Sequence, residues 1–400
     1  MKIIFYTHPS FLGHKSMPRF TNMLAKGMAI RGHEVEVWSP SGVFARLSKS
    51  SSLIKYLGYI DQLLIFPFQA KLILKRKDEA LHVLTDHALG PWMSFIKKRK
   101  HVVHCHDFIA QKAAVNKIED LKIGSLGRYY QNLIKKGYSK AHNFISVSET
   151  TRKDLHLFKP ETLKNSQVVY NGLNQNFKPS ESITSLRRQL EQKLNISLSN
   201  GFLFHIGNNE WYKNRTGVIN LYDYWRNSNK HSKPLIMVGP KPTKDLIALK
   251  EASGFSKDIL FLDNIADDLV RDLYSAATLL IFPSYTEGFG WPIAEAMASG
   301  CPVITTAEAP MTEVGGKAAF YIPKRPYKQN EQNEWLKVGA KEIEKVVSLS
   351  LEERKKVISS GIHNSKRFDS KQALDSIENI YKSCYSKNYE NPSCSRSNGS

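Results

Sequence analysis

The chain has 400 residues, 41% of them hydrophobic and 24% charged, which is too long for one compact core and suits two soluble domains. Its four cysteines are scattered and form no CxxC pair, which argues against a disulfide framework or a zinc site and favours a reducing compartment. The net charge is +20, and residues 1–180 carry most of it, with 28 Lys and Arg against 12 Asp and Glu. This excess indicates an anionic partner of the first half (a membrane face, an acidic acceptor or nucleic acid) or simply a solvated basic surface.

Short apolar runs alternate with helical patterns along the first half. Residues 2–8 predict a buried strand, and this apolar run is too short and is followed too early by polar residues to be a signal peptide. Residues 19–33 predict an amphipathic helix that Gly32 ends. Further strands are expected at 34–40, 102–107 and 143–148. Strands separated by helices indicate right-handed βαβ units and a parallel sheet.

Residues 52–77 form the most apolar helical stretch of the chain. Three charged residues and Pro67 interrupt it, so we expect no transmembrane span. The pattern favours a core helix of the first domain. The alternative is a helix lying on an anionic bilayer, which the basic residues 75–77 and the aromatic and aliphatic side chains would suit.

The second half repeats the organisation of the first. The polar run 179–184 predicts a linker, after which strands are expected at 201–207, 234–240, 258–264, 277–284 and 301–306. Two such halves would leave a cleft between them, with ligands at the carboxyl ends of the strands. We place the domains at 1–180 and 181–364, expect a C-terminal helix at about 365–385 to pack back on the first domain, and expect a disordered tail at 386–400.

The stretch 285–306 predicts a turn from a strand into a helix. Gly288 and Gly290 allow the backbone to approach a ligand closely. Pro292 fits the first turn of a helix that stops at Gly300, since its missing N–H costs nothing there. Free N–H groups at the start of a helix attract anions.

Two carboxylates flank this turn. Glu287 lies in the loop, and Glu295 is expected in the first helical turn. Carboxylates accept hydrogen bonds in pairs, so the two could hold hydroxyl groups of a sugar or a ribose. The alternative is that Glu295 merely complements the helix dipole.

The run E-G-F-G-W-P-I-A-E-A-M-A-S-G-C-P-V-I, residues 287–304, is similar to the EX7E signature of retaining GT-B glycosyltransferases of family 4. The similarity continues in register to Glu313 and Gly315. Further pieces occur in the family's order: GHEVEVWSP, VVHCHDF, SVSETTRKDL, VVYNGLN, HIGNNEWYKN and DLYSAATLLIFPS. The resemblance covers the chain from Met1 to about Tyr385. It implies an α/β fold of the GT-B class, with two Rossmann-like domains facing each other across a deep cleft.

For the donor, the resemblance implies that Lys213 neutralises the diphosphate as the leaving group develops charge, rather than being a plain surface lysine. Relatives often carry an arginine directly after the strand glycine. This chain has Asn208 there, so Arg215 is the candidate for that role. Glu295 corresponds to the ribose-binding glutamate, and Glu287 to the one near the transferred sugar. The donor-binding set is completed by the backbone of Gly288, Phe289, Gly290 and Trp291.

For the first domain, the resemblance implies that His106, followed by Asp107, touches the sugar or the acceptor, although a lone histidine is often structural. Asp86 and His87 also follow a strand, and either line the acceptor side or are structural. Gly13 occupies the first strand-to-helix loop, where relatives have two adjacent glycines and the backbone approaches the diphosphate.

The resemblance thus implies transfer of a hexose from a UDP- or GDP-sugar to a glycan or lipid-linked acceptor, with retention, in cell-surface polysaccharide or glycolipid synthesis. No DxD-type motif follows a strand, since Asp267 and Asp268 begin a helix, so no metal and no other cofactor are expected. The expected location is cytoplasmic, with the inner, anionic membrane face as a further partner. The alternatives are a GT-B epimerase or hydrolase, and a basic nucleic-acid-binding protein. For the last we find no reader motif, so no nucleic acid is expected.

Overall fold

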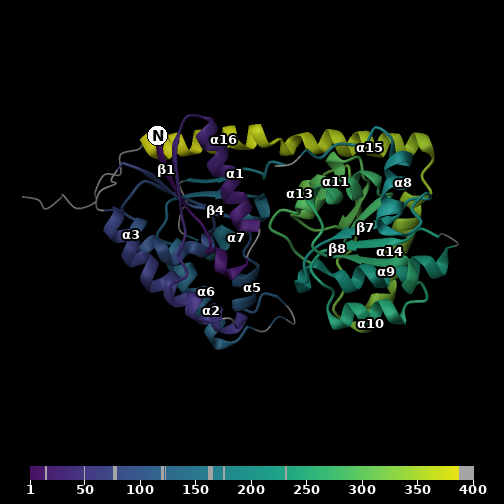
Figure 1. Ribbon diagram of the computed structural model, residues 1–400, viewed down its shortest axis with the longest axis horizontal. Coiled ribbons are helices and arrows are strands. Elements are labelled where there is room, and N and C mark those ends of the chain that lie inside the picture. Colours follow the sequence, from purple (N-terminus) through teal and green to yellow (C-terminus); the bar gives the residue numbers. More distant parts are fainter. Residues whose placement is uncertain are drawn as a thin grey trace, which may run out of the picture. The chain divides into compact units, whose positions relative to one another are not determined.

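The computed structural model in Figure 1 describes residues 1–13, 16–48, 50–74, 79–118, 121, 123–160, 165–173, 176–229 and 232–386. The chain divides into two compact units, Met1–Gly172 with Ser370–Ser400, and Leu173–Asp369. The second unit begins before residue 180 and ends after 364 because Leu173 pairs with Asp369, and the Leu173 N–H donates to the Phe368 carbonyl at 2.8 Å. Apart from Ser386, the tail expected at 386–400 lies outside the described residues.

The first unit is a six-stranded parallel sheet in the order β2-β1-β3-β4-β5-β6. Its strands are β1 (Lys2–Tyr6), β2 (Glu34–Trp38), β3 (Leu81–Leu84), β4 (His101–Cys105), β5 (Asn143–Ser146) and β6 (Asn165–Val168). Its α-helices are α1 (Ser16–Ile30), α2 (Ser51–Ile60), α3 (Phe66–Leu74), α4 (Met93–Ile96), α5 (Ile109–Ala114), α6 (Ser125–Tyr138), α7 (Glu149–Phe158) and α16 (Ser370–Ser386). The strands expected in the first half are confirmed. Those at the centre of the sheet, β3 and β4, are buried along their whole length, although each also contains histidine.

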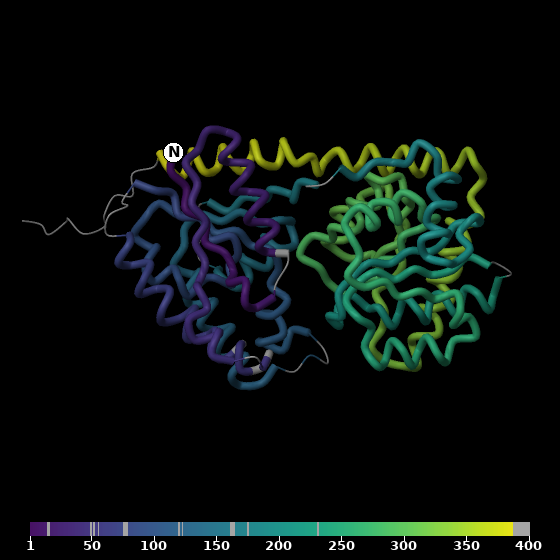
Figure 2. The backbone as a smooth tube through the Cα atoms, viewed as in Figure 1, coloured from purple at the N-terminus to yellow at the C-terminus, as the bar shows by residue number. Residues whose placement is uncertain are grey.

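Helix α16 returns the end of the chain to this sheet, where Figure 2 shows its yellow tube beside the purple N-terminal segment. Its residues Ile377 and Tyr381 pack with Phe5 of β1 in one apolar cluster. The Tyr381 hydroxyl lies 2.6 Å from His104 Nε2 on β4, so the helix is joined to the buried sheet by a polar contact as well.

Helices α2 and α3 form one continuous helical stretch, residues 51–74, because a π-helical turn, η3 (Asp61–Ile65), joins them. Pro67 therefore does not end the helix. The wide turn accommodates the proline ring, and the Gln62 carbonyl accepts a hydrogen bond from the indole of Trp92 at 2.8 Å. By length and composition, Tyr56–Leu74 is the one helix within the described residues that could cross a membrane. Of its apolar 18-residue segment, 33% is buried inside the protein.

The second unit is also a six-stranded parallel sheet, in the order β12-β11-β10-β7-β8-β9. Its strands are β7 (Leu203–Ile206), β8 (Leu235–Val238), β9 (Ile259–Leu262), β10 (Leu279–Phe282), β11 (Val303–Thr306) and β12 (Phe320–Ile322). Its α-helices are α8 (Ile183–Leu194), α9 (Arg215–Ser228), α10 (Lys244–Ala252), α11 (Asp267–Ala276), α12 (Trp291–Ala298), α13 (Met311–Gly315), α14 (Gln332–Val347) and α15 (Leu351–Ser365). All five strands expected in this half are confirmed. Trp225 and Trp335 belong to its core.

The strand order of each sheet contains one point at which the direction of strand addition reverses. In the first unit the direction of strand addition reverses between β1 and β3, and in the second it reverses between β7 and β10. The loops that follow two such strands diverge to opposite faces of the sheet and leave a crevice, which is where doubly wound sheets bind ligands. Each unit therefore has one expected ligand position.

Candidate functional site

In the second unit, the loops that follow β7 and β10 are tied together. The Tyr285 N–H donates to the Tyr212 carbonyl at 2.8 Å, and the Asn214 side-chain amide donates to the Pro283 carbonyl at 2.9 Å. Asn214 adopts a left-handed conformation, with φ of 51°, directly after a 3₁₀ turn that ends at Lys213. The backbone of Lys213 is thereby fixed beside the end of β10.

Lys213 is paired with Glu287. Its ammonium donates to both carboxylate oxygens, at 2.7 and 2.8 Å, and the two side chains are only 14% and 9% exposed. The same ammonium lies 5.3 Å from the ring centres of Tyr212 and Phe282. The alternative that Lys213 is a plain surface lysine is therefore wrong. The pair places one cation and one carboxylate at the crevice where the direction of strand addition reverses.

The turn into α12 follows the pattern expected from the sequence. Gly290 precedes the helix with φ of 102°, a left-handed conformation that favours glycine, and Pro292 lies in the first turn. The Phe289 side chain is buried and packs edge-on against Trp291 and Phe368. Only the backbone of Phe289 is thus available to a ligand.

Glu295 accepts a hydrogen bond from the Tyr274 hydroxyl of α11 at 2.7 Å. Tyr274 is fully buried, and burial together with the Glu295 carboxylate raises the pKa of its hydroxyl well above the usual value, so it remains a donor. Glu295 was expected in the first helical turn. Because α12 begins at Trp291, Glu295 instead lies just beyond that turn. The charge at the helix start falls off within one turn, so the alternative of a simple dipole partner loses its basis.

Arg215, the first residue of α9, contacts different loops from Lys213. Its guanidinium donates to the Asn209 side chain and, at 3.3 Å, to the Pro240 carbonyl after β8. Burial lowers its pKa. With Asn209, Tyr285 and other residues it lines a cavity of about 360 Å³. The structure thus gives Lys213 and Arg215 different partners, and the second diphosphate contact stays a prediction.

In the first unit, the loops after β1 and β3 also meet. His8 Nε2 lies 2.9 Å from one Asp86 oxygen, and His87 Nδ1 lies 3.1 Å from the other. Burial alone would raise the pKa of the Asp86 carboxyl, but its contacts with His8 and His87 hold it well below its usual range. Asp86 also accepts from the Ala88 N–H and so caps the following turn. Asp86 therefore has a structural role at this turn, and its role toward the acceptor stays a prediction.

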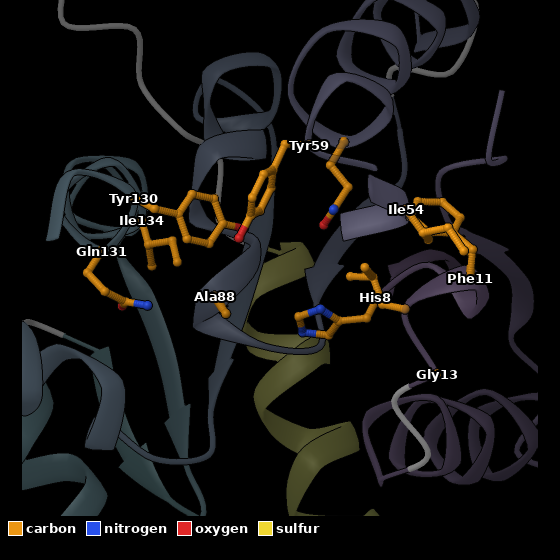
Figure 3. A pocket seen from close by; sticks show the side chains of 11 residues that line it. His8, Phe11, Gly13, Ile54, Tyr59, Ala88, Tyr130, Gln131 and Ile134 are labelled. Atoms are coloured by element: carbon orange, nitrogen blue, oxygen red, sulfur yellow. The ribbon is translucent and has the colours of Figure 1, made fainter. Parts of the chain in front are cut away.

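A cavity of about 490 Å³ opens beside this pair (Figure 3). It is lined by His8, Phe11, Leu12, Gly13, Ile54, Tyr59, Gln62, Ala88, Tyr130, Gln131 and Ile134. The Tyr59 and Tyr130 rings, from α2 and α6, pack against each other on its wall, with centroids 4.8 Å apart. Gly13 ends a 3₁₀ turn in a left-handed conformation, with φ of 70°, and the structure places it on the wall of this cavity.

His106 lies just beyond β4 and is buried. Its Nε2 donates to the Thr85 carbonyl at 2.9 Å, and its ring packs edge-on against Phe20. Burial lowers its pKa, so the ring is neutral near pH 7 and its Nδ1 carries a lone pair that can accept from a hydroxyl. His106 is not among the residues that line the cavity. Asp107 accepts from the Ile109 N–H at the start of α5.

Three contributors were missed from the sequence. His8 lies two residues beyond the end of β1 and was counted as the last residue of the predicted strand 2–8; its place at a strand end could have identified it. Tyr274 and Asn214 gave no such signal, because a tyrosine within a helix and an asparagine in a loop acquire their roles only through distant partners. Among the described residues, no group of three or more His, Cys, Asp and Glu side chains is arranged to hold a metal ion.

Comparison with known proteins defines the class. HepE of Anabaena, whose structure was determined in complex with UDP and glucose, superposes with a TM-score of 0.69 at 18% identity, covering 96% of this chain and all of that one. Two six-stranded parallel sheets with flanking helices give this chain the GT-B fold.

Residues 17–177 match glycosyltransferase family 4, and residues 187–361 match the glycosyl transferases group 1. The chain belongs to this glycosyltransferase family.

Two curated relatives come from Escherichia coli. The chain is 27% identical to O-antigen chain mannosyltransferase B over 198 residues, which are 48% of this chain and 50% of the relative. It is 28% identical to the lipopolysaccharide glucosyltransferase WaaG over 172 residues, 43% of this chain and 46% of the relative. The chain thus spans about half the length of the curated relatives that it matches.

Proposed function

We propose that this protein transfers a hexose from a UDP- or GDP-sugar to a glycan or lipid-linked acceptor, with retention, in the synthesis of a cell-surface polysaccharide or glycolipid. The observation that carries the proposal is the buried Lys213–Glu287 pair beside the start of α12. HepE, which binds UDP and glucose, supports a nucleotide-sugar donor. The O-antigen and lipopolysaccharide enzymes support a hexose and a cell-surface glycan.

On this proposal, the second unit binds the donor. Lys213 neutralises the diphosphate together with the N–H groups at the start of α12, where the backbone of residues 288–291 faces the sugar and phosphates. Glu287 accepts from a hydroxyl of the transferred sugar, and Glu295 accepts from the ribose. Arg215 and, from the first unit, the backbone of Gly13 are further diphosphate contacts.

The chemical step follows from this charge arrangement. The bond between the anomeric carbon and the diphosphate oxygen breaks, and a bond from the acceptor oxygen forms on the same face of the sugar. The departing diphosphate oxygen takes the proton of the acceptor hydroxyl, and Lys213 stabilises the negative charge that develops. His106 Nδ1 accepts a hydrogen bond from a sugar or acceptor hydroxyl.

Because Lys213 and the helix start supply the positive charge, we propose that turnover needs no metal. The check is nucleotide release in the presence of excess chelator, with added Mg²⁺ in a parallel reaction. Release that stops with chelator and returns with Mg²⁺ contradicts this part of the proposal.

The test of the function is a panel of nucleotide sugars scored by nucleotide release, with and without acceptor extracts. Glu287→Ala is expected to abolish release, while the control Glu308→Ala removes a carboxylate that is 53% exposed and should leave release unchanged. If no donor is turned over better by the wild type than by Glu287→Ala, the site assignment is wrong. Release that never depends on an acceptor indicates a hydrolase instead.

A further inference from the structure

The helical stretch 51–74 has two different faces. Phe66, Ala70 and Leu74 are buried in the first unit, and the Phe66 ring lies 4.5 Å from that of Trp92. The opposite side exposes six large apolar side chains, each between 48% and 66% exposed: Leu53, Tyr56, Leu64, Phe68, Leu72 and Ile73. These six residues are called the apolar face below. The expectation of a core helix is therefore confirmed for the side that carries Phe66, Ala70 and Leu74, and does not account for the exposed apolar side chains.

The exposed charge described within residues 51–74 is basic. Within residues 51–74 and the adjoining helix α6, the one acidic residue is Asp61. Its side chain is fully buried, where it accepts from the N–H groups of Phe44 and Ala45 at 3.0 and 2.9 Å. The one exposed charged side chain described within residues 51–74 is Lys71. On α6, Lys136 is exposed, whereas Arg128 and Lys135 line a separate cavity with Gln111 and Phe158. After Leu74 the sequence continues with Lys75, Arg76, Lys77 and Asp78, which lie outside the described residues, and then with the exposed Glu79.

Exposed apolar side chains next to Lys71 and the basic run 75–77 suit an anionic bilayer, which offers apolar chains below a layer of negative headgroups. A protein partner would have to match six large side chains while presenting acidic groups around them. A span across the membrane is disfavoured, because it would remove Phe66, Ala70 and Leu74 from the core and break the Trp92–Gln62 hydrogen bond. The helix is thus anchored on one side and unpartnered on the other.

We propose that the apolar face lies on an anionic lipid bilayer and is the membrane-docking surface of this protein. The inference rests on the proposed function in one respect, the class of acceptor. The same helix that exposes Leu53 and Tyr56 presents Ile54 and Tyr59 to the cavity of the first unit (Figure 3). Docking brings this cavity to the lipid surface, so a lipid-linked acceptor can reach it without leaving the membrane.

Vesicle flotation of the full chain tests the docking surface. The wild type is expected to float with vesicles of phosphatidylcholine and phosphatidylglycerol at seven to three, and to bind pure phosphatidylcholine about tenfold more weakly, since each basic residue near an anionic surface adds to binding. Leu64→Ser/Phe68→Ser is expected to reduce binding to the mixed vesicles at least tenfold by removing apolar side chains. The control Gln69→Ser changes an exposed polar residue of the same helix and should bind as the wild type does.

Several outcomes overturn the proposal. They are a wild type that does not float with mixed vesicles, equal binding to neutral vesicles, and a double variant that floats as well as the control. If light scattering shows a dimer that the double variant dissociates, the apolar face is a protein interface instead.

Nucleotide release separates this test from that of the proposed function. Leu64 and Phe68 belong to the first unit, whereas Lys213, Glu287 and Glu295 belong to the second, so the double variant should release nucleotide from a soluble donor at the wild-type rate. If no donor is turned over by any variant while flotation follows the expected pattern, the proposed function fails and the docking surface stands.

Discussion

Replacing Lys213 and Glu287 together by neutral side chains, in Lys213→Met/Glu287→Gln, separates the structural role of this pair from its role toward the donor. Each single change leaves one buried charge without its partner, because the two side chains are only 14% and 9% exposed. The double change removes both charges and preserves side-chain length. Stability and activity should therefore respond differently across the three variants.

The expected magnitudes follow from the burial of the pair. Removing one partner of a buried ion pair costs about 3–5 kcal/mol, and the residual exposure places this pair near about 3 kcal/mol. In a unit of about 200 residues, that loss lowers the Tm by roughly 6–12 °C, at about 2–4 °C for each kcal/mol. The double variant should lose no more than about 1 kcal/mol, since a neutral pair of similar volume often substitutes well for a buried ion pair.

Activity should not recover with stability. If Lys213 stabilises the leaving diphosphate, both single variants and the double variant lose about a hundredfold or more in kcat/KM, the typical loss for one preorganised charge-stabilising group. Thermal melts and nucleotide release on the same preparations provide the measurement. A double variant that keeps kcat/KM within about threefold of the wild type refutes the catalytic role, and single variants with unchanged Tm refute the argument from burial.

Three further outcomes are expected. Tyr274→Phe removes the hydrogen bond to Glu295, worth about 1.5–3 kcal/mol to a charged acceptor, so the donor KM should rise at least about tenfold with kcat nearly unchanged; an unchanged KM contradicts the positioning role. Gly290→Ala strains a left-handed residue by about 1–2 kcal/mol and should weaken donor binding, whereas Gly254→Ala, an open position, should not; equal affinities contradict the turn argument. Burial lowers the pKa of His104 to about 3 from 6.5, so the stability that neutral His104 contributes is fully present above pH 6.5 and falls by about 1.4 kcal/mol for each pH unit as the pH drops from 6.5 toward 3. Urea denaturation at pH 7 and 5 should therefore show a shallower pH dependence of stability in His104→Gln than in the wild type. An equal pH dependence contradicts the role of His104.

Local sequence predicted nine of the twelve strands, all but β3, β6 and β12, and the turn at the donor site. Strands such as Leu279–Phe282 were recognisable because central strands of a parallel sheet are buried on both faces and read as unbroken apolar runs. The turn at Gly290 and Pro292 was also predicted, because the conformational preferences of glycine and proline act on the backbone within a few residues. The position of Glu295 relative to the first turn was missed by a small shift in where the helix begins.

Only the tertiary structure decided which of these pieces meet. Lys213 and Glu287 are 74 residues apart, and His8 and Asp86 are 78 apart, so their contacts depend on the strand order that places β7 beside β10 and β1 beside β3. That order follows from how the crossover helices pack, which local periodicity does not encode. Composition likewise showed that residues 51–74 are apolar but not that one side faces the core and the other does not. Burial is a property of the neighbours that a folded chain supplies, and here these neighbours cover only one side of the helix.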